Sequence, residues 1–98
     1  MIDVVIQRSD KPGKKYDAVI NGNKVISFGA KGYEDFTIHK DVKRREHYIK
    51  RHSNECWDKA NLASPAFMSR WILWEKPSIN EAIKHANNMY KDVKFHLT

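Results

Sequence analysis

The chain has 98 residues, of which 41% are hydrophobic, and its 18 lysines and arginines outnumber its 12 aspartates and glutamates. This length allows a single domain, residues 1–98, and the apolar fraction excludes an intrinsically disordered chain. The net charge of +6 favours nucleic acid, anionic lipid headgroups or acidic proteins as partners.

Cysteine content and hydropathy narrow the cellular setting. Cys56 is the only cysteine, so no internal disulfide can form and a reducing compartment is expected. No secretory signal is visible. The longest apolar-rich run, AFMSRWILW, is about half the length of a membrane-spanning helix and contains Arg70, so we expect no transmembrane segment and no membrane partner.

The first third of the chain predicts three β-strands. Residues with high strand propensity gather in the runs MIDVVIQRS, KYDAVI and KVISF. Between the second and third runs, Asn21 and Gly22 suit the positive φ angles of a tight turn, so these two strands should pair antiparallel.

A basic helix is predicted next, from Asp41 as N-cap to about Ser53. Its apolar side comprises Val42, Tyr48, Ile49, His52 and, if the helix continues, Cys56. Its other side is basic and comprises Lys43, Arg44, His47, Lys50 and Arg51.

Two further helices and a last strand follow. Ser64 and Pro65 should begin an aromatic helix that ends near Trp74, and apolar side chains surround nearly its whole circumference. The run SINE has the spacing of a capping box and should begin the third helix. Alternating apolar residues in VKFHL allow a C-terminal strand. The expected fold class is α+β: a small antiparallel sheet, built from an N-terminal hairpin or meander with a possible C-terminal strand, packed by three helices.

Metal binding and catalysis find little support in the pattern. His52 and Cys56 offer two ligands at i,i+4 spacing, where a structural zinc site requires four. No glycine-rich oxyanion turn accompanies Cys56, the carboxylates are scattered, and the phosphate-binding pattern GxxxxGK[ST] is missing. We therefore expect no metal, no cofactor, no catalytic residue and no enzymatic activity. An enzyme that uses Cys56 would require a fast-reacting thiol.

The basic helix supports binding to a nucleic-acid backbone. Its stripe is about two turns long and could follow a row of phosphates without reading bases. A solvated face that only keeps the protein soluble is an equally good interpretation. The candidate nucleic-acid-binding residues are Lys40, Lys43, Arg44, His47, Lys50 and Arg51.

The aromatic helix supports a competing hypothesis. Large aromatic side chains are usually buried, so the core is the first interpretation. If one side of the helix stays open, tryptophan with arginine is the composition of a protein-contact surface. The candidate protein-interface residues are Phe67, Arg70, Trp71 and Trp74.

The runs YEDFTIHKD, REHYIKRH, ECW and SRWILWEKPSI resemble a group of short, uncharacterised proteins of large double-stranded DNA viruses of algae and amoebae. The resemblance covers roughly residues 28–83. The group often has a glycine-containing stretch where this chain reads ANLASPAFMSR, which leaves the local turn open. The resemblance implies a viral protein, made in the cytoplasm or nucleus of an infected host cell, with a packaged or structural role plausible; it supplies no catalytic residues.

Two hypotheses result. In the first, a small non-enzymatic viral binding protein contacts nucleic-acid backbone non-specifically through its basic helix. In the second, a minor capsid or virion-associated structural protein docks on a viral coat protein through its aromatic helix. The choice between DNA and RNA, packaging in the virion and a homo-oligomeric state all stay open.

Overall fold

Alternating apolar residues fold the N-terminal third into a three-stranded antiparallel meander. In the computed structural model, which describes residues 1–98, the strands are β1 (Ile2–Arg8), β2 (Lys14–Ile20) and β3 (Lys24–Ala30). Val4 lies opposite Ile20, and Tyr16 lies opposite Phe28. The predicted tight turn is confirmed, since Asn21 and Gly22 both have positive φ angles.

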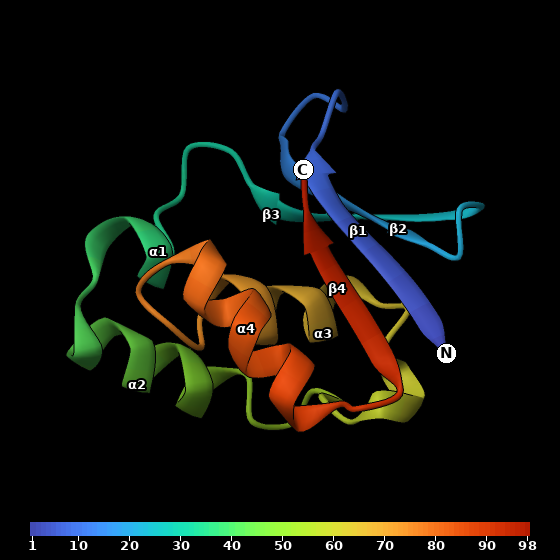
Figure 1. The fold of residues 1–98 in the computed structure, drawn as a ribbon. Coiled ribbons are helices and arrows are strands. Elements are labelled where there is room, and N and C mark those ends of the chain that lie inside the picture. The colour runs from blue at the N-terminus through green and yellow to red at the C-terminus, as the bar shows by residue number, and fades with distance from the viewer.

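The C-terminal run VKFHL forms the fourth strand, β4 (Val93–Leu97), beside β1. It runs parallel to β1, with Ile2 opposite Val93, and the strand order is β3-β2-β1-β4. The sheet is therefore mixed, whereas the sequence suggested antiparallel pairing alone. Parallel neighbours require a long crossover, and here β2, β3 and the whole helical half of the chain lie between β1 and β4 (Figure 1).

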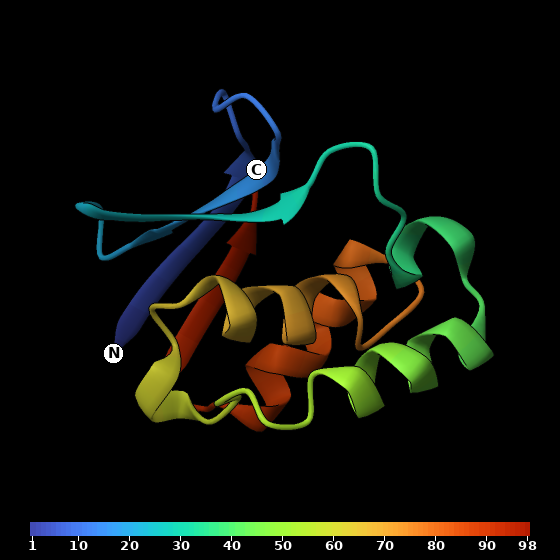
Figure 2. The same ribbon diagram turned by 180° about the vertical axis from the view of Figure 1, so that it is seen from behind.

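The helices lie on one face of the sheet (Figures 1 and 2). The three predicted helices are confirmed, and each begins at the expected cap: the side chains of Asp41, Ser64 and Ser78 accept hydrogen bonds from first-turn amides. The aromatic helix is α-helical in its first half and π-helical in its second. The helical elements are α1 (Phe36–His39), α2 (Val42–Arg51), the 3-10 turn η1 (Lys59–Asn61), α3 (Pro65–Met68), the π-helical η2 (Ser69–Leu73) and α4 (Ile79–Met89).

The aromatic helix forms the centre of the core. Phe67, Met68 and Ile72 are fully buried against the inner face of the sheet, where Phe28 is also fully buried. The α4 helix packs beside η2 and against β4. This arrangement leaves α2 as the outermost helix, on the far side of η2 from the sheet.

The apolar side predicted for the basic helix is only partly correct. Tyr48 is the one buried residue of α2, whereas Val42 is 60% exposed. Ile49 and His52 are half-buried, and Cys56 lies beyond the helix on the surface. The reason is that α2 sits at the edge of the helical layer, where a narrow strip suffices to hold it.

Gly29 brings β3 close to η2. Its φ angle is +77°, in the left-handed region, and a Cβ atom here would lie 3.0 Å from Leu73 Cδ1 and 3.2 Å from Lys15 Cβ. Gly22 has a similar φ of +76° but nothing within 4 Å of its Cβ position. Replacement of Gly22 by alanine therefore introduces backbone strain alone, whereas replacement of Gly29 introduces strain together with crowding.

We predict that Gly29→Ala lowers the free energy of unfolding by about 2 kcal/mol, through left-handed strain together with crowding of Leu73. Gly22→Ala should cost about 1 kcal/mol, because it meets the strain alone. Urea unfolding of both variants measures the difference. Equal losses would mean that Leu73 and Lys15 move aside freely.

Candidate functional site

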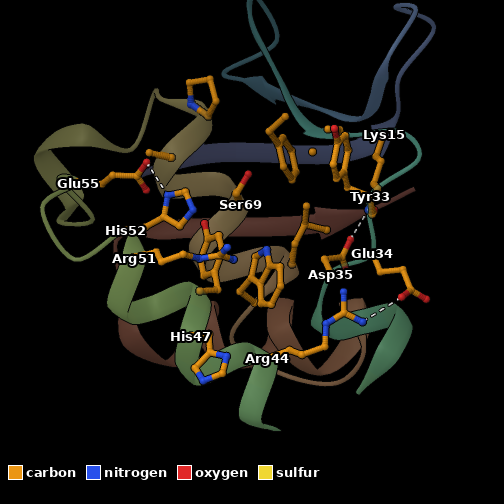
Figure 3. A pocket seen from close by; sticks show the side chains of 18 of the residues that line it. Lys15, Tyr33, Glu34, Asp35, Arg44, His47, Arg51, His52, Glu55 and Ser69 are labelled. Atoms are coloured by element: carbon orange, nitrogen blue, oxygen red, sulfur yellow. Dashed lines mark hydrogen bonds and ion pairs between the residues drawn. The ribbon is translucent and has the colours of Figure 1, made fainter. Parts of the chain in front are cut away.

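A groove of about 1100 Å³ opens between the sheet and α2 (Figure 3). On one side lie the start of β2, the end of β3 and the loop that leads into α1. On the other side lies α2, and residues of α3 and η2 close the inner end. The groove forms because the segment of α3 and η2 lies between the sheet and α2 (Figure 2).

Cationic side chains approach the groove from both sides. Lys14 and Lys15 come from β2, and three more come from α2. Figure 3 shows Lys15 on the opposite side of the groove from Arg51. Two of the five cations have carboxylate partners and three have none. The unpaired cations are Lys14, Lys50 and Arg51.

The two paired cations differ in their surroundings. Lys15 Nζ lies 2.7 Å from Asp35 Oδ2; the Asp35 side chain is buried, and that of Lys15 is mostly covered. Asp35 also caps α1 by accepting from the amide of Thr37, so this pair fixes the loop before α1. Arg44 lies 3.0 Å from Glu34, but both side chains are about half exposed. An exposed pair of this kind exchanges readily with solvent, so Arg44 can still meet an anion.

The structure divides the predicted basic stripe. Four of its six members line the groove, and Lys43 is exposed outside it. Lys40 does not line the groove: it precedes α2 and is the left-handed C-cap residue of α1. Its Nζ donates to the carbonyls of Thr37 and Pro77, at 3.1 and 2.6 Å. The four groove members are Arg44, His47, Lys50 and Arg51.

Sequence reasoning missed the opposite side of the groove. Lys14, Lys15 and Tyr33 lie in or beside strands, and no periodicity links them to α2. The only local signal is the pair of lysines after Gly13, which alone reads as a polar turn. The sheet and η2 together bring these residues opposite the helix.

Stacked rings hold α2 against η2. Tyr48 stacks on Trp74 with ring centroids 4.2 Å apart and an interplanar angle of 1°. His52 also stacks on Tyr48, with ring centroids 4.4 Å apart. The Nδ1 atom of His52 lies 3.0 Å from Glu55 Oε2. Burial, with the nearby negative charge of Glu55, raises the pKa of Tyr48 well above its usual value of 10. Tyr48 therefore stays a neutral phenol in the wall of the groove.

The partly buried carboxylate of Glu75 also fixes α2. Glu75 Oε1 accepts from Arg45 at 2.8 Å and from Arg70 at 2.7 Å, and Oε2 lies 3.3 Å from His85 Nε2. Burial on its own would raise the pKa of Glu75, but hydrogen bonds and charge from the two guanidinium groups outweigh it and lower the pKa. Glu75 thus stays ionised and joins α2, η2 and α4.

The four residues expected to form a docking surface on the aromatic helix make mostly internal contacts. Phe67 is fully buried, and Arg70 is 9% exposed with its guanidinium 4.4 Å from the centroid of the Trp71 ring. The indole of Trp71 donates to the carbonyl of Trp57 at 3.0 Å, and Trp74 is covered by Tyr48. Phe67 belongs to the hydrophobic core, and Trp71 and Trp74 pack against it while partly buried.

No three histidine, cysteine or carboxylate side chains converge in a way that could hold a metal ion. None of the helices combines the length and apolar content that a bilayer crossing requires.

Comparison with known proteins gives one match. The sequence model of a family of unknown function (DUF5754) matches residues 4–52, which is half of the chain. The matched segment contains β1 to β3, α1 and α2, and hence both walls of the groove. Neither a curated protein nor a solved structure is detectably similar to the chain.

We predict that Glu75→Gln lowers the free energy of unfolding at pH 7 by about 3 kcal/mol, because it leaves Arg70 buried without a counter-charge. The folded-state pKa of Glu75 is lowered, so its contribution is present above the unfolded-state pKa of about 4 and is lost as pH falls through the folded-state value. The variant and the wild type should therefore converge in stability toward pH 3.

Urea unfolding at pH 7 and pH 3 measures this effect. Glu34→Gln is the matched control, because it removes a carboxylate from an exposed pair with Arg44 and should cost less than about 1 kcal/mol. A Glu75→Gln loss that persists unchanged at pH 3 would contradict an ionic role for Glu75.

Proposed function

This chain belongs to the family of unknown function DUF5754, and we propose that its groove binds the phosphate backbone of a nucleic acid. The observation that carries the proposal is the placement of unpaired cations on two facing sides of one recess: Lys14 on the strand side, and Lys50 and Arg51 on the helix side. Such a recess can hold a chain of phosphates between its walls.

Charge and geometry favour contact with phosphates over recognition of sequence. Five cationic side chains line the groove against three acidic ones, Glu34, Asp35 and Glu55. Lysine and arginine contacts to phosphate supply affinity and orientation but carry no sequence information. Binding should therefore be non-specific, strongly salt-dependent and independent of any chemical step, so the proposed role is that of a non-enzymatic binding protein.

The proposed biological setting rests on the resemblance of the central sequence runs to proteins of large DNA viruses. It supports a viral origin, the cytoplasm or nucleus of an infected cell as location, and a role on viral nucleic acid, inside or outside the virion. The alternative role, docking on a coat protein through the aromatic helix, loses support because Phe67 and Arg70 are buried.

We predict that the triple variant Lys14→Gln, Lys50→Gln, Arg51→Gln weakens binding to single-stranded or duplex oligonucleotides at least about tenfold at low salt. The slope of log affinity against log salt should become shallower by about 2, because up to three phosphate contacts are lost. Fluorescence anisotropy with labelled random-sequence oligonucleotides across a salt series measures both quantities.

A second triple variant is the matched control. Lys24, Lys84 and Lys94 are exposed, lie outside the groove and form no ion pair, so their replacement by glutamine removes the same charge elsewhere. It should retain most of the affinity. Equal losses in the two triples would assign binding to net charge and contradict the groove. If no oligonucleotide binds the wild-type chain at low salt, the proposed function fails.

A Lys43 variant distinguishes binding in the groove from binding on the outer face of α2. It belongs to the basic stripe but does not line the groove. Lys43→Gln should therefore change affinity far less than Arg51→Gln in the same assay. The reverse order would place the phosphates on the outer face of the helix.

A further inference from the structure

Tyr33 is the most exposed aromatic residue at the groove. The residue is 75% exposed. It lies in the loop between β3 and α1, on the Lys15 side of the groove (Figure 3). It belongs neither to the hydrophobic core nor to any ring pair. The folded chain therefore does not need this ring for its own packing.

The loop that carries Tyr33 is nevertheless held firmly. Lys15 Nζ donates to the Tyr33 carbonyl, and the Tyr33 amide donates to the Ala30 carbonyl at 3.3 Å. Two residues further on, the buried carboxylate of Asp35 pairs with Lys15 and fixes the end of the loop. A fixed backbone with a free aromatic ring is a pre-organised contact surface, because little loop entropy is lost when a ligand binds.

A nucleic-acid base is the partner that suits an exposed ring beside cations. Bases stack on aromatic side chains while lysine and arginine follow the adjacent phosphates. This contact requires an unpaired base, because a duplex keeps its bases stacked inside. The cations also line a concave recess, whereas a duplex is a convex cylinder that would reach only the rim.

Resting on the proposed function, we propose that the groove is a site for single-stranded nucleic acid, in which the backbone lies between Lys14 and Arg51 and one base stacks on Tyr33. Single-stranded RNA and single-stranded DNA present the same phosphates and bases, so both are ligands of this chemistry. Stacking of this kind tolerates any base, in agreement with binding that does not read sequence.

The test measures anisotropy with a labelled single strand of about 12 thymidines, the matching RNA and the matching duplex, for the wild type and Tyr33 variants. The wild type should bind the single strands more tightly than the duplex. Tyr33→Ala should weaken single-strand binding by about five- to hundredfold, and Tyr33→Phe should retain it, because stacking needs the ring and not the hydroxyl. Duplex affinity and the salt slope should not change in either variant.

An abasic single strand supplies the control for stacking. It keeps the phosphates and lacks the bases, so Tyr33→Ala should not weaken its binding further. Tyr33 is exposed, so the variants should fold as the wild type does, and urea unfolding verifies this.

Equal binding of duplex and single strand, or equal affinity of wild type and Tyr33→Ala for the thymidine strand, would overturn this inference. In that case salt-dependent binding that is lost in the Lys14, Lys50, Arg51 triple would still support the proposed function. Absence of binding to every oligonucleotide would overturn both. A difference between the RNA and DNA strands would identify which of them is the better ligand.

Discussion

The position of α2 depends on the carboxylate of Glu75. This group accepts hydrogen bonds from Arg45 of α2 and Arg70 of η2, and lies beside His85 of α4, so three helices meet at one charge. An arginine buried without a partner would cost far more than the pair gains, which makes the geometry of this cluster specific. The stacking of Tyr48 on Trp74 closes the same junction with apolar contact. Without these two contacts, α2 would have little to hold it beside η2.

The junction explains why the groove exists at all. The sheet packs on α3, η2 and α4, whereas α2 contacts α1 and is joined to Trp74 and Glu75, just after η2, by Tyr48 and Arg45. The space between α2 and the strands is therefore bounded on two sides but not filled. Cations from β2 and from α2 project into this space, and buried or half-exposed carboxylates neutralise some of them. The unpaired ones give the recess its positive character.

Residues of the aromatic helix make contacts that stabilise the fold. The π-helical turn η2 places Arg70 against two tryptophan rings and directs its guanidinium to Glu75. Arginine and tryptophan are the same residue types that enrich protein interfaces, because both combine large contact area with polar groups. Composition alone therefore does not distinguish an interface from a core in which an arginine is paired.

The sequence by itself determined the local structure of this protein. The caps at Asp41, Ser64 and Ser78, the Asn21–Gly22 turn and the apolar alternation act over a few residues, so three strands, three helices and the α+β class could be read directly. Four of the six predicted basic-stripe residues also line the groove. Only the tertiary structure decided that β4 is parallel to β1, that Lys40 binds backbone carbonyls and that Lys14, Lys15 and Tyr33 face α2. These features depend on contacts between residues far apart in the chain, and no local pattern records such contacts.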